Sequence, residues 1–108
     1  MLVLTTTGRR SGKKHATPVL CHRDCDGSLL VIAVNGAADW NPDWFGNLVA
    51  DPHVEIDFEG AHRLAHALVL DGDDRADTWA AAASAFPGLD AAQREAQRII
   101  PLIRLTIE

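Results

Sequence analysis

Long apolar runs are missing from this 108-residue sequence, so it shows no segment of the roughly 20 apolar residues that a membrane-spanning helix needs. The opening MLVLTTTG is too short for a signal peptide and lacks the basic region that begins one. We therefore expect a cytoplasmic protein with no integral membrane segment. Hydrophobic residues make up 47% of the chain and charged residues 23%, and this ordinary composition and length predict a single domain over residues 1–108.

Cysteine is also scarce, and its two copies, Cys21 and Cys25, are too few for a disulfide framework. Their spacing, CHRDC, is not the C-x-x-C of a zinc site, and the sequence holds no second cysteine pair. His22 lies between them and could complete a three-ligand cluster. We favour a strand thiol and a turn thiol instead, and we predict no metal centre.

Acidic residues are absent from the first 23 positions, although the whole chain has a net charge of -5. Those positions hold half of the ten Lys and Arg residues, and the rest of the chain holds all fifteen Asp and Glu. The basic segment is therefore a local feature, and the acidic remainder would repel a nucleic acid. A small anion with a few negative groups fits this charge distribution better.

The basic residues are concentrated in one loop, TTTGRRSGKKH at positions 5–15. Its glycines allow backbone N–H groups to turn toward an anion, and arginine offers a planar fork to phosphate or carboxylate oxygens. The hydroxyl groups of Thr7 and Ser11 add donors. The loop is not a P-loop, because only three residues separate its glycines and Lys14 follows Lys13. A cradle for a phosphate or carboxylate and a solvated hairpin tip both remain open at this point.

Hydrophobic periodicity predicts the element order β-β-β-α-β-β-α-α-β. Asn41 is expected to cap the first helix with Pro42 at its first position, and Trp40 and Phe45 could form a hydrophobic staple across that start. The expected strands cover 1–7, 16–23, 29–34, 53–58, 61–70 and 102–107, and the expected helices cover 41–50, 71–86 and 90–99.

Hairpin links between these strands favour an antiparallel sheet. About six short strands with tight turns remove their edges most simply by closing into a small barrel. The fold class is therefore mainly β (α+β), a barrel of about six mostly antiparallel strands with two to three helices.

Two signatures in the chain resemble one known family. The first is TTTGRRSG at 5–12, followed by TPVL at 17–20 and by the pairs Asp26-Gly27 and Asn35-Gly36. The second, NPDWFGNLVADP at 41–52, is similar to the pattern N-P-x-W-[YF]-x-N-L-x-A-N-P of the deazaflavin-dependent nitroreductase family. That resemblance implies a split β-barrel related to FMN-binding oxidoreductases. It also implies coenzyme F420, a deazaflavin with a phosphate and a polyglutamate tail.

By position, the resemblance assigns the phosphate and tail to the basic loop and the ring system to two strands and one helix. Trp44 and Asn47, three residues apart on one helix face, would close the pocket near the ring. Core packing is the structural alternative for Trp44, and a surface amide is the alternative for Asn47. The cofactor-binding residues implied are Arg9, Arg10, Ser11, Gly12, Lys13, His15, Ala16, Thr17, Pro18, Ile32, Ala33, Val34, Asn35, Gly36, Trp44 and Asn47.

The chain also departs from the family pattern. His15 stands where many relatives have arginine, which makes one tail contact weaker or pH-dependent, and Asn35 stands where a lysine is frequent. Relatives that reduce nitro compounds place tyrosines over the substrate, but this chain has none, and only Phe86 keeps an aromatic ring there. The substrate pocket is expected at Leu20, Phe86 and Leu89.

The function expected from the resemblance is hydride transfer from reduced deazaflavin to a small electron-poor acceptor, such as an activated alkene, a quinone or a nitro compound. No catalytic side chain is assigned, and Ser11, His15 or solvent could donate a proton. The alternatives are an F420 carrier without turnover and an FMN-binding protein of the same barrel. A homodimer is left open, with Trp40 or Trp79 as contacts.

Overall fold

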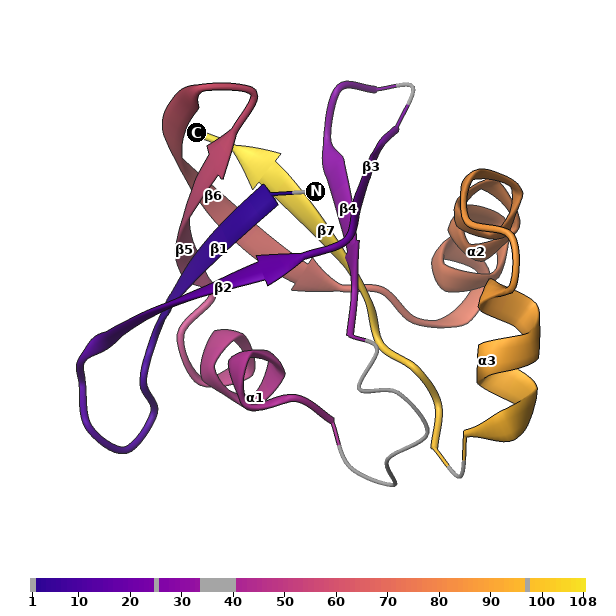
Figure 1. Ribbon diagram of the computed structural model, residues 1–108, viewed down its shortest axis with the longest axis horizontal. Coiled ribbons are helices and arrows are strands. Elements are labelled where there is room, and N and C mark those ends of the chain that lie inside the picture. Colours follow the sequence, from indigo (N-terminus) through magenta and orange to yellow (C-terminus); the bar gives the residue numbers. More distant parts are fainter. Residues whose placement is uncertain (1, 25, 34–40, 97) are drawn as a thin grey trace.

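The computed structural model describes residues 2–24, 26–33, 41–96 and 98–108, and within them it contains seven strands and three helices (Figure 1). The strands are β1 (Leu2–Thr7), β2 (Lys14–Val19), β3 (Cys21–Arg23), β4 (Leu29–Ile32), β5 (His53–Phe58), β6 (Ala61–Val69) and β7 (Leu102–Ile107). The helices are α1 (Asp43–Ala50), α2 (Gly72–Ala85) and α3 (Leu89–Glu95).

All seven strands belong to one antiparallel sheet with the order β2-β1-β5-β6-β7-β4-β3. The two strands at the ends of this order are consecutive in the chain and are separated only by Leu20. The sheet therefore curls until its two edges come together at one point of the backbone, which makes a half-barrel. The predicted fold class, a mainly β barrel of antiparallel strands with helices, is confirmed.

The strand predicted at 16–23 is in fact two strands, which brings the total to seven instead of six. Val19 pairs with Leu2 of β1, whereas Cys21 pairs with Val31 of β4. The chain therefore changes its hydrogen-bonding neighbour at Leu20. A hydrophobic pattern shows which residues face a core, but it carries no information about which strand lies alongside.

The predicted start of the first helix is wrong. Helix α1 begins at Asp43, and Pro42 occupies the capping position in an extended conformation with no side-chain cap. The side chain of Asn41 has another partner, since its Oδ1 accepts a hydrogen bond from Nη1 of Arg98 at 2.6 Å. The staple predicted between Trp40 and Phe45 includes a residue outside the described ranges.

The predicted end of the third helix is also wrong, since α3 stops at Glu95 and Ala96 is extended. The side chain of Gln93 supports the irregular segment that follows. Its Nε2 donates to the carbonyl of Arg98 at 2.8 Å, and its Oε1 accepts from the N–H of Ile100 at 2.8 Å. These bonds replace the helical hydrogen bonds that a longer α3 would have made.

Two hydrophobic clusters lie on the two sides of the sheet. The inner cluster fills the curl, where α1 covers it, and it includes Leu4, Ile56 and Trp44. The second cluster packs the sheet against α2 and α3 and includes Ile100 and Leu102. Strand β4 contributes to both clusters, as its unbroken apolar sequence predicted, and all four of its residues are buried.

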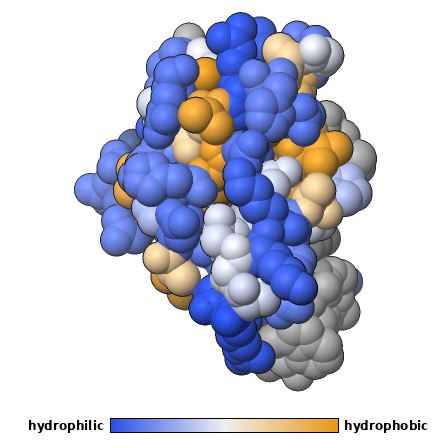
Figure 2. All heavy atoms as spheres, turned by 90° about the vertical axis from the view of Figure 1, so that its left-hand side faces the viewer, coloured by the Kyte–Doolittle hydropathy of each residue, from blue (hydrophilic) through white to orange (hydrophobic). Residues whose placement is uncertain are grey.

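The face of the molecule at the left of Figure 1 is mostly hydrophilic (Figure 2). Hydrophobic side chains gather in its upper half, toward the hairpin between β5 and β6. The basic loop between β1 and β2 lies at the opposite end of the sheet, beside α1 (Figure 1). The two ends of the curled sheet therefore present different surfaces.

Candidate functional site

Two glycines shape the basic loop. The N–H of Gly8 donates to the carbonyl of Lys13 at 2.7 Å, and the N–H of Gly12 donates to the carbonyl of Gly8 at 2.9 Å. Gly12 has a φ of 72°, a left-handed conformation that side chains disfavour. A Cβ on Gly8 would lie 2.6 Å from Oγ of Ser11 and 2.9 Å from Nε2 of His15. Gly12 therefore requires glycine, and a side chain at Gly8 would displace Ser11 and His15, which the tight turn brings together.

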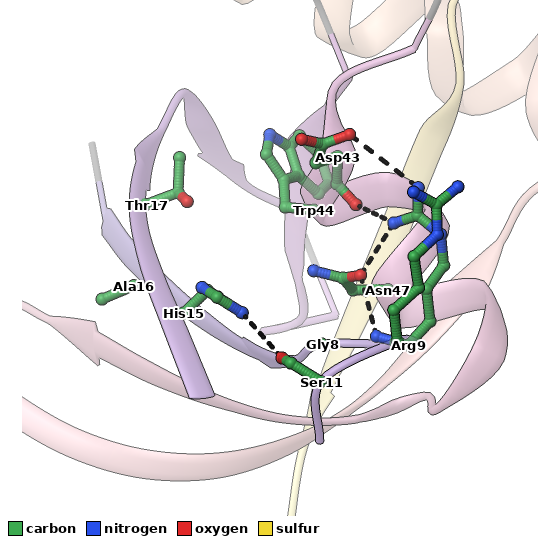
Figure 3. Close-up of a pocket in the computed structure, with 10 residues that line it drawn as sticks. Gly8, Arg9, Ser11, His15, Ala16, Thr17, Asp43, Trp44 and Asn47 are labelled. Atoms are coloured by element: carbon green, nitrogen blue, oxygen red, sulfur yellow. Dashed lines mark hydrogen bonds and ion pairs between the residues drawn. The ribbon is translucent and has the colours of Figure 1, made fainter. Parts of the chain in front are cut away.

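A cavity of about 400 Å³ lies between this loop, strand β2 and helix α1 (Figure 3). Its volume is in the range of small-molecule sites, about 300–1,000 Å³. The loop side is cationic and rich in hydroxyl and imidazole groups, and the helix side carries an indole and an amide. The cavity is lined by Gly8, Arg9, Arg10, Ser11, His15, Ala16, Thr17, Asp43, Trp44 and Asn47.

Arg9 is directed at helix α1 and holds the loop against it (Figure 3). Its Nη1 donates to the carbonyl of Asp43 at 3.0 Å and to Oδ1 of Asn47 at 2.8 Å, and its backbone N–H donates to the same Oδ1 at 3.2 Å. The guanidinium rests on the backbone at Gly46, where a Cβ would lie 2.8 Å from Cζ of Arg9. The glycine in the middle of α1 therefore makes room for this arginine.

Asn47 is the centre of this junction and is not a surface amide, because only 6% of it is exposed. Besides the two bonds from Arg9, its Nδ2 donates to Oγ1 of Thr6 at 3.3 Å, and Thr6 is 1% exposed. The amide therefore connects α1 both to β1 and to the loop that follows it. Its polar atoms are satisfied by the protein, which suits a residue that fixes the shape of a pocket.

Trp44 is part of the core and part of the cavity wall at once. It is 7% exposed and belongs to the inner cluster, as the core-packing alternative predicted. It also lines the cavity, beside the loop and opposite Ala16 and Thr17 of β2 (Figure 3). A rigid aromatic wall of this kind suits a flat ring system.

The loop groups directed to solvent are those of Arg10, Ser11, Lys13 and His15, all of which are exposed. Oγ of Ser11 accepts a hydrogen bond from the N–H of Lys13 at 3.2 Å and lies 3.5 Å from Nε2 of His15. The side chains of Arg10 and Lys13 have no hydrogen-bond or ion-pair partner among the described residues, so both cations are available to a ligand. Arg10 lines the cavity, and Lys13 lies outside its lining.

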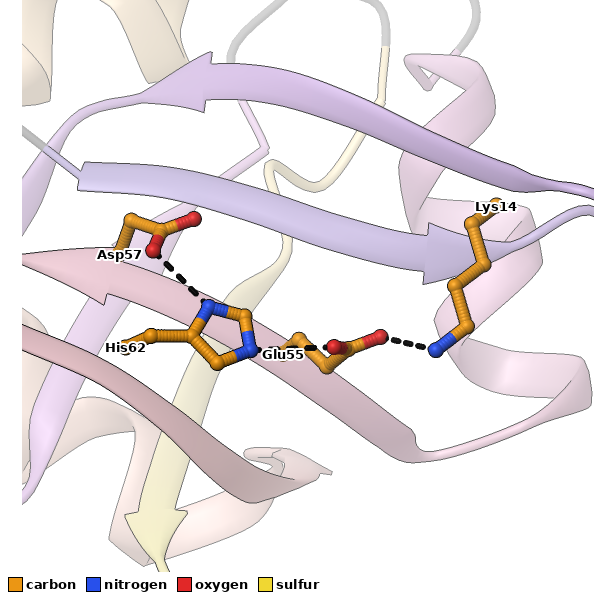
Figure 4. A network of polar contacts seen from close by, with 4 residues as sticks. All are labelled: Lys14, Glu55, Asp57 and His62. Carbon is orange, nitrogen blue, oxygen red and sulfur yellow. Dashed lines mark hydrogen bonds and ion pairs between the residues drawn. The ribbon is translucent and has the colours of Figure 1, made fainter.

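Lys14 is different, because it points to the outer face of the sheet and forms an ion pair with Glu55 (Figure 4). Oε1 of Glu55 lies 3.1 Å from Nε2 of His62, whose Nδ1 lies 2.9 Å from Oδ1 of Asp57. The hydrogen bond from Lys14 is the main cause that lowers the pKa of Glu55. Hydrogen bonds to Asp57 and then to Glu55 raise the pKa of His62. The network joins β2, β5 and β6 and leaves Lys14 out of the cavity.

Only some of the strand residues that the resemblance implies for the cofactor line the cavity. Ala16 and Thr17 line the cavity and Pro18 does not. Ile32 and Ala33 are buried, at 3% and 0% exposure, and belong to different clusters. Val34, Asn35 and Gly36 lie outside the described residues.

The residues expected to contact the substrate do not line this cavity. Leu89 is 6% exposed and lies in the second cluster, against which Phe86 also packs. Phe86 further meets the ring of His22 edge-on, with centroids 6.3 Å apart. Leu20 is 43% exposed at the junction of β2 and β3. The described part of the structure therefore does not bring these three residues together with the loop.

Sequence reasoning did not assign Gly8 or Asp43 to the cavity, or Thr6 to its support. Gly8 belongs to the first signature, so its position gave a signal. Thr6 belongs to the same signature, but its contact with Asn47, which is 41 residues away in the chain, could not be read from it. In the parts of the chain that the structure describes, we find no group of three metal-ligating side chains and no helix long and apolar enough to cross a membrane.

The family model of the F420H(2)-dependent quinone reductases matches residues 1–106 of this chain. The chain belongs to this family. It is 33% identical over 104 residues to the protein Rv3178 of Mycobacterium tuberculosis (strain ATCC 25618 / H37Rv), which carries the same family name. The match covers 96% of this chain and 87% of that protein, so the deazaflavin-dependent oxidoreductase family expected from the two signatures is confirmed.

Solved structures agree with this assignment. The structure of an F420-H2 dependent reductase, FDR-A, superposes with a TM-score of 0.84 at 28% identity and covers 96% of this chain and 91% of that one. A second structure, described as a domain-swapped dimer, superposes with a TM-score of 0.85 at 28% identity, over 96% of this chain and 78% of that one. The half-barrel and its helices are thus shared along nearly the whole chain.

Proposed function

We propose that this protein is an F420H(2)-dependent oxidoreductase that reduces a small electron-poor acceptor, with quinones as the first class to test. The family supports the cofactor and the reaction type. The observation that carries the proposal is the cavity between the basic loop and α1, because it is cationic on one side and aromatic on the other.

The residues of this cavity fit the cofactor that the family implies. F420 has an anionic tail and a flat ring system, so it needs cations at one end and an apolar wall at the other. Arg10 supplies a cation for the tail, with the hydroxyl of Ser11 as a donor beside it. Trp44 and the small side chain of Ala16 supply the apolar wall for the ring system. An acidic protein with a net charge of -5 gains a local site for an anion in this way.

We assign the tail to Arg10 and Lys13, with Ser11 as a further donor. Arg9 has a different task in this proposal, because its hydrogen bonds to α1 keep the loop closed against the helix. Trp44 and Asn47 hold the inner wall, and their burial excludes water from that side. When it is bound, the reduced deazaflavin supplies a hydride to the acceptor, and the protein supplies position and a dry surface.

The proposal is tested by titrating the purified protein with F420 and with FMN under the same conditions. We expect F420 to bind with micromolar or tighter affinity and FMN to bind more weakly. Reduced F420 is then mixed with a panel of quinones, enones and nitroaromatic compounds, and its oxidation is followed by absorbance. Tighter binding of FMN would overturn the cofactor assignment. Binding without oxidation by any acceptor would identify a carrier instead of a reductase.

We also propose that the protein forms a homodimer in the cytoplasm. The support is the relative described as a domain-swapped dimer, which shares the fold over 96% of this chain. Sedimentation equilibrium of the purified chain measures its mass directly. A mass of 11.7 kDa at all protein concentrations would contradict the dimer.

A further inference from the structure

A second cavity lies at the end of the curled sheet opposite the basic loop. It has a volume of about 320 Å³ and opens beside the hairpin between β5 and β6, at the top of Figure 1. It shares no lining residue with the cavity beside the loop. Its lining consists of Arg23, Ile56, Phe58, Glu59, Ala61, Arg63 and Ile107, and we call it the mouth pocket.

The two arginines of the mouth pocket stand at positions that face the inside of the curl. Arg63 of β6 is directly opposite Ile56 of β5, which is 0% exposed and belongs to the inner cluster. Arg23 of β3 is directly opposite Leu29 of β4, which is 1% exposed and belongs to the same cluster. Residues that pair directly across two strands project from the same face of the sheet. Both arginines therefore extend the inner face of the sheet to its open end.

The remaining wall of the mouth pocket is apolar and incompletely covered. Ile107 is 38% exposed, although it pairs with Ala65, which is 1% exposed and buried in the inner cluster. Phe58 is half-buried and packs against that cluster from its edge. An apolar wall at the mouth of a β-barrel is a common place for a ligand.

The mouth pocket has a net positive charge, although the whole chain has a net charge of -5. Nη2 of Arg23 pairs with Oε1 of Glu59 at 3.4 Å, and its guanidinium lies 5.3 Å from the ring centre of Phe58. Among the residues that the structure describes, Arg63 has no carboxylate partner. The pocket therefore contains two cations and one anion, which leaves one guanidinium for an outside carboxylate.

We infer that the mouth pocket is a ligand site for a small amphipathic carboxylate. Its carboxylate would pair with Arg63, and its apolar body would cover Ile56, Phe58 and Ile107. An inorganic anion would use the guanidinium but would gain nothing from the apolar wall. A neutral apolar molecule would cover the wall but leave the arginine without a partner, so an acid with an aromatic or branched aliphatic body matches both halves.

The test is calorimetric titration of the full-length protein with 2-naphthoate, with its neutral analogue 2-naphthamide and with inorganic phosphate. We expect saturable binding of 2-naphthoate. 2-Naphthamide should bind at least tenfold more weakly because it loses the charged hydrogen bond, and phosphate should bind at least tenfold more weakly because it loses the apolar contact. Arg63→Gln should weaken 2-naphthoate at least tenfold. Arg94→Gln, which removes another exposed arginine from α3, should leave it unchanged.

Four results would overturn the inference. Equal binding of 2-naphthoate and 2-naphthamide would show that the arginine is not involved, and so would an unchanged affinity in Arg63→Gln. Loss of binding in an Arg10→Ala, Lys13→Ala double variant would place 2-naphthoate in the cavity beside the loop. Amide NMR signals of Phe58 and Ile107 that shift with protein concentration alone would show that the pocket is a contact between two copies.

Discussion

Four cations stand within six residues of the basic loop, and the structure separates them into two pairs. The outer pair, Arg9 and Lys14, is bound to other parts of the protein: Arg9 to Asn47 and the backbone of α1, and Lys14 to Glu55. The inner pair, Arg10 and Lys13, has no such partner in the described residues. Residues of the same charge in the same loop therefore have different tasks, since the outer pair holds the loop in place and the inner pair is left for a ligand.

A basic motif is therefore not a set of equal contacts. The partners of the outer pair lie 38 and 41 residues further along the chain. Removing a cation of the outer pair should change the shape or stability of the protein, and removing a cation of the inner pair should change affinity alone.

The largest effect is expected from Arg10→Ala combined with Lys13→Ala. The affinity for F420 should fall by more than tenfold, because each charged contact is worth about 1.5 kcal/mol or more. The melting temperature should stay close to that of the wild type, since surface-loop changes usually cost under ~0.5 kcal/mol. Fluorescence titration measures the affinity, and Lys14→Ala is the matched control that should retain it. An unchanged affinity in the double variant would show that the loop is not the anion site.

The next effect is expected from Asn47→Ala, which removes the amide between the loop and α1. The change leaves the buried hydroxyl of Thr6 and the N–H of Arg9 without their partner, which costs about 1–3 kcal/mol. Urea unfolding should show this loss of stability. Full stability in this variant would mean that the junction does not support the fold.

A smaller effect is expected from Gly46→Ala. The added methyl group would lie 2.8 Å from Cζ of Arg9, so the guanidinium must move off the helix while Asn47 remains in place. The bonds from Arg9 to α1 should weaken, and F420 affinity should fall by less than in the double loop variant. Alanine is otherwise a better helix former than glycine, so a gain in stability without any loss of affinity would show that Arg9 does not position the loop.

The smallest effect concerns pH and the network around Lys14. The pKa of His62 in the folded protein lies above its ordinary 6.5. The contribution of the charged His62 to stability is therefore complete below pH 6.5. It is lost as the pH rises through the raised pKa of the folded protein. The pKa of Glu55 in the folded protein lies below its ordinary 4.5. The contribution of the charged Glu55 to stability is therefore present above pH 4.5, and it is lost as the pH falls through the lowered pKa of the folded protein. The network should therefore stabilise most between these two pH values.

Thermal melts of the wild type and of His62→Gln at pH 5.5, 7 and 8.5 measure this contribution. The wild type should exceed the variant at the lowest pH, and the difference should shrink as the pH rises. A constant difference would mean that the charge of His62 is not involved. Because His62 and Asp57 are both largely exposed, solvent screening keeps the effect small.

Much of the fold could be predicted because the local signals agree with the tertiary structure. The alternation of Val54, Ile56 and Phe58 predicted β5 with its bounds, and the Glu59-Gly60 turn follows from it. The turn has a positive φ at both residues, 52° and 79°, the pattern of a two-residue hairpin. The fold class followed from short links between such strands.

The errors arose where distant residues decide the local structure. Asn41 is a good capping residue by type, but Arg98 holds its side chain, so the helix begins one residue later than predicted, with Pro42 at the cap. The third helix ends early because Gln93 bonds to the backbone beyond it. At the candidate site, the two signatures located the loop and α1, but the contact between Arg9 and Asn47 could not be read from either one alone.

The continuity of β2 and β3 has a consequence for how this site can vary between relatives. The backbone that begins at the edge of the cavity crosses to the opposite edge of the sheet through a single residue, Leu20. Inserting or deleting one residue there would turn every side chain of β3 to the wrong face, including Cys21 and Arg23. Related proteins should therefore agree in the length of this crossing.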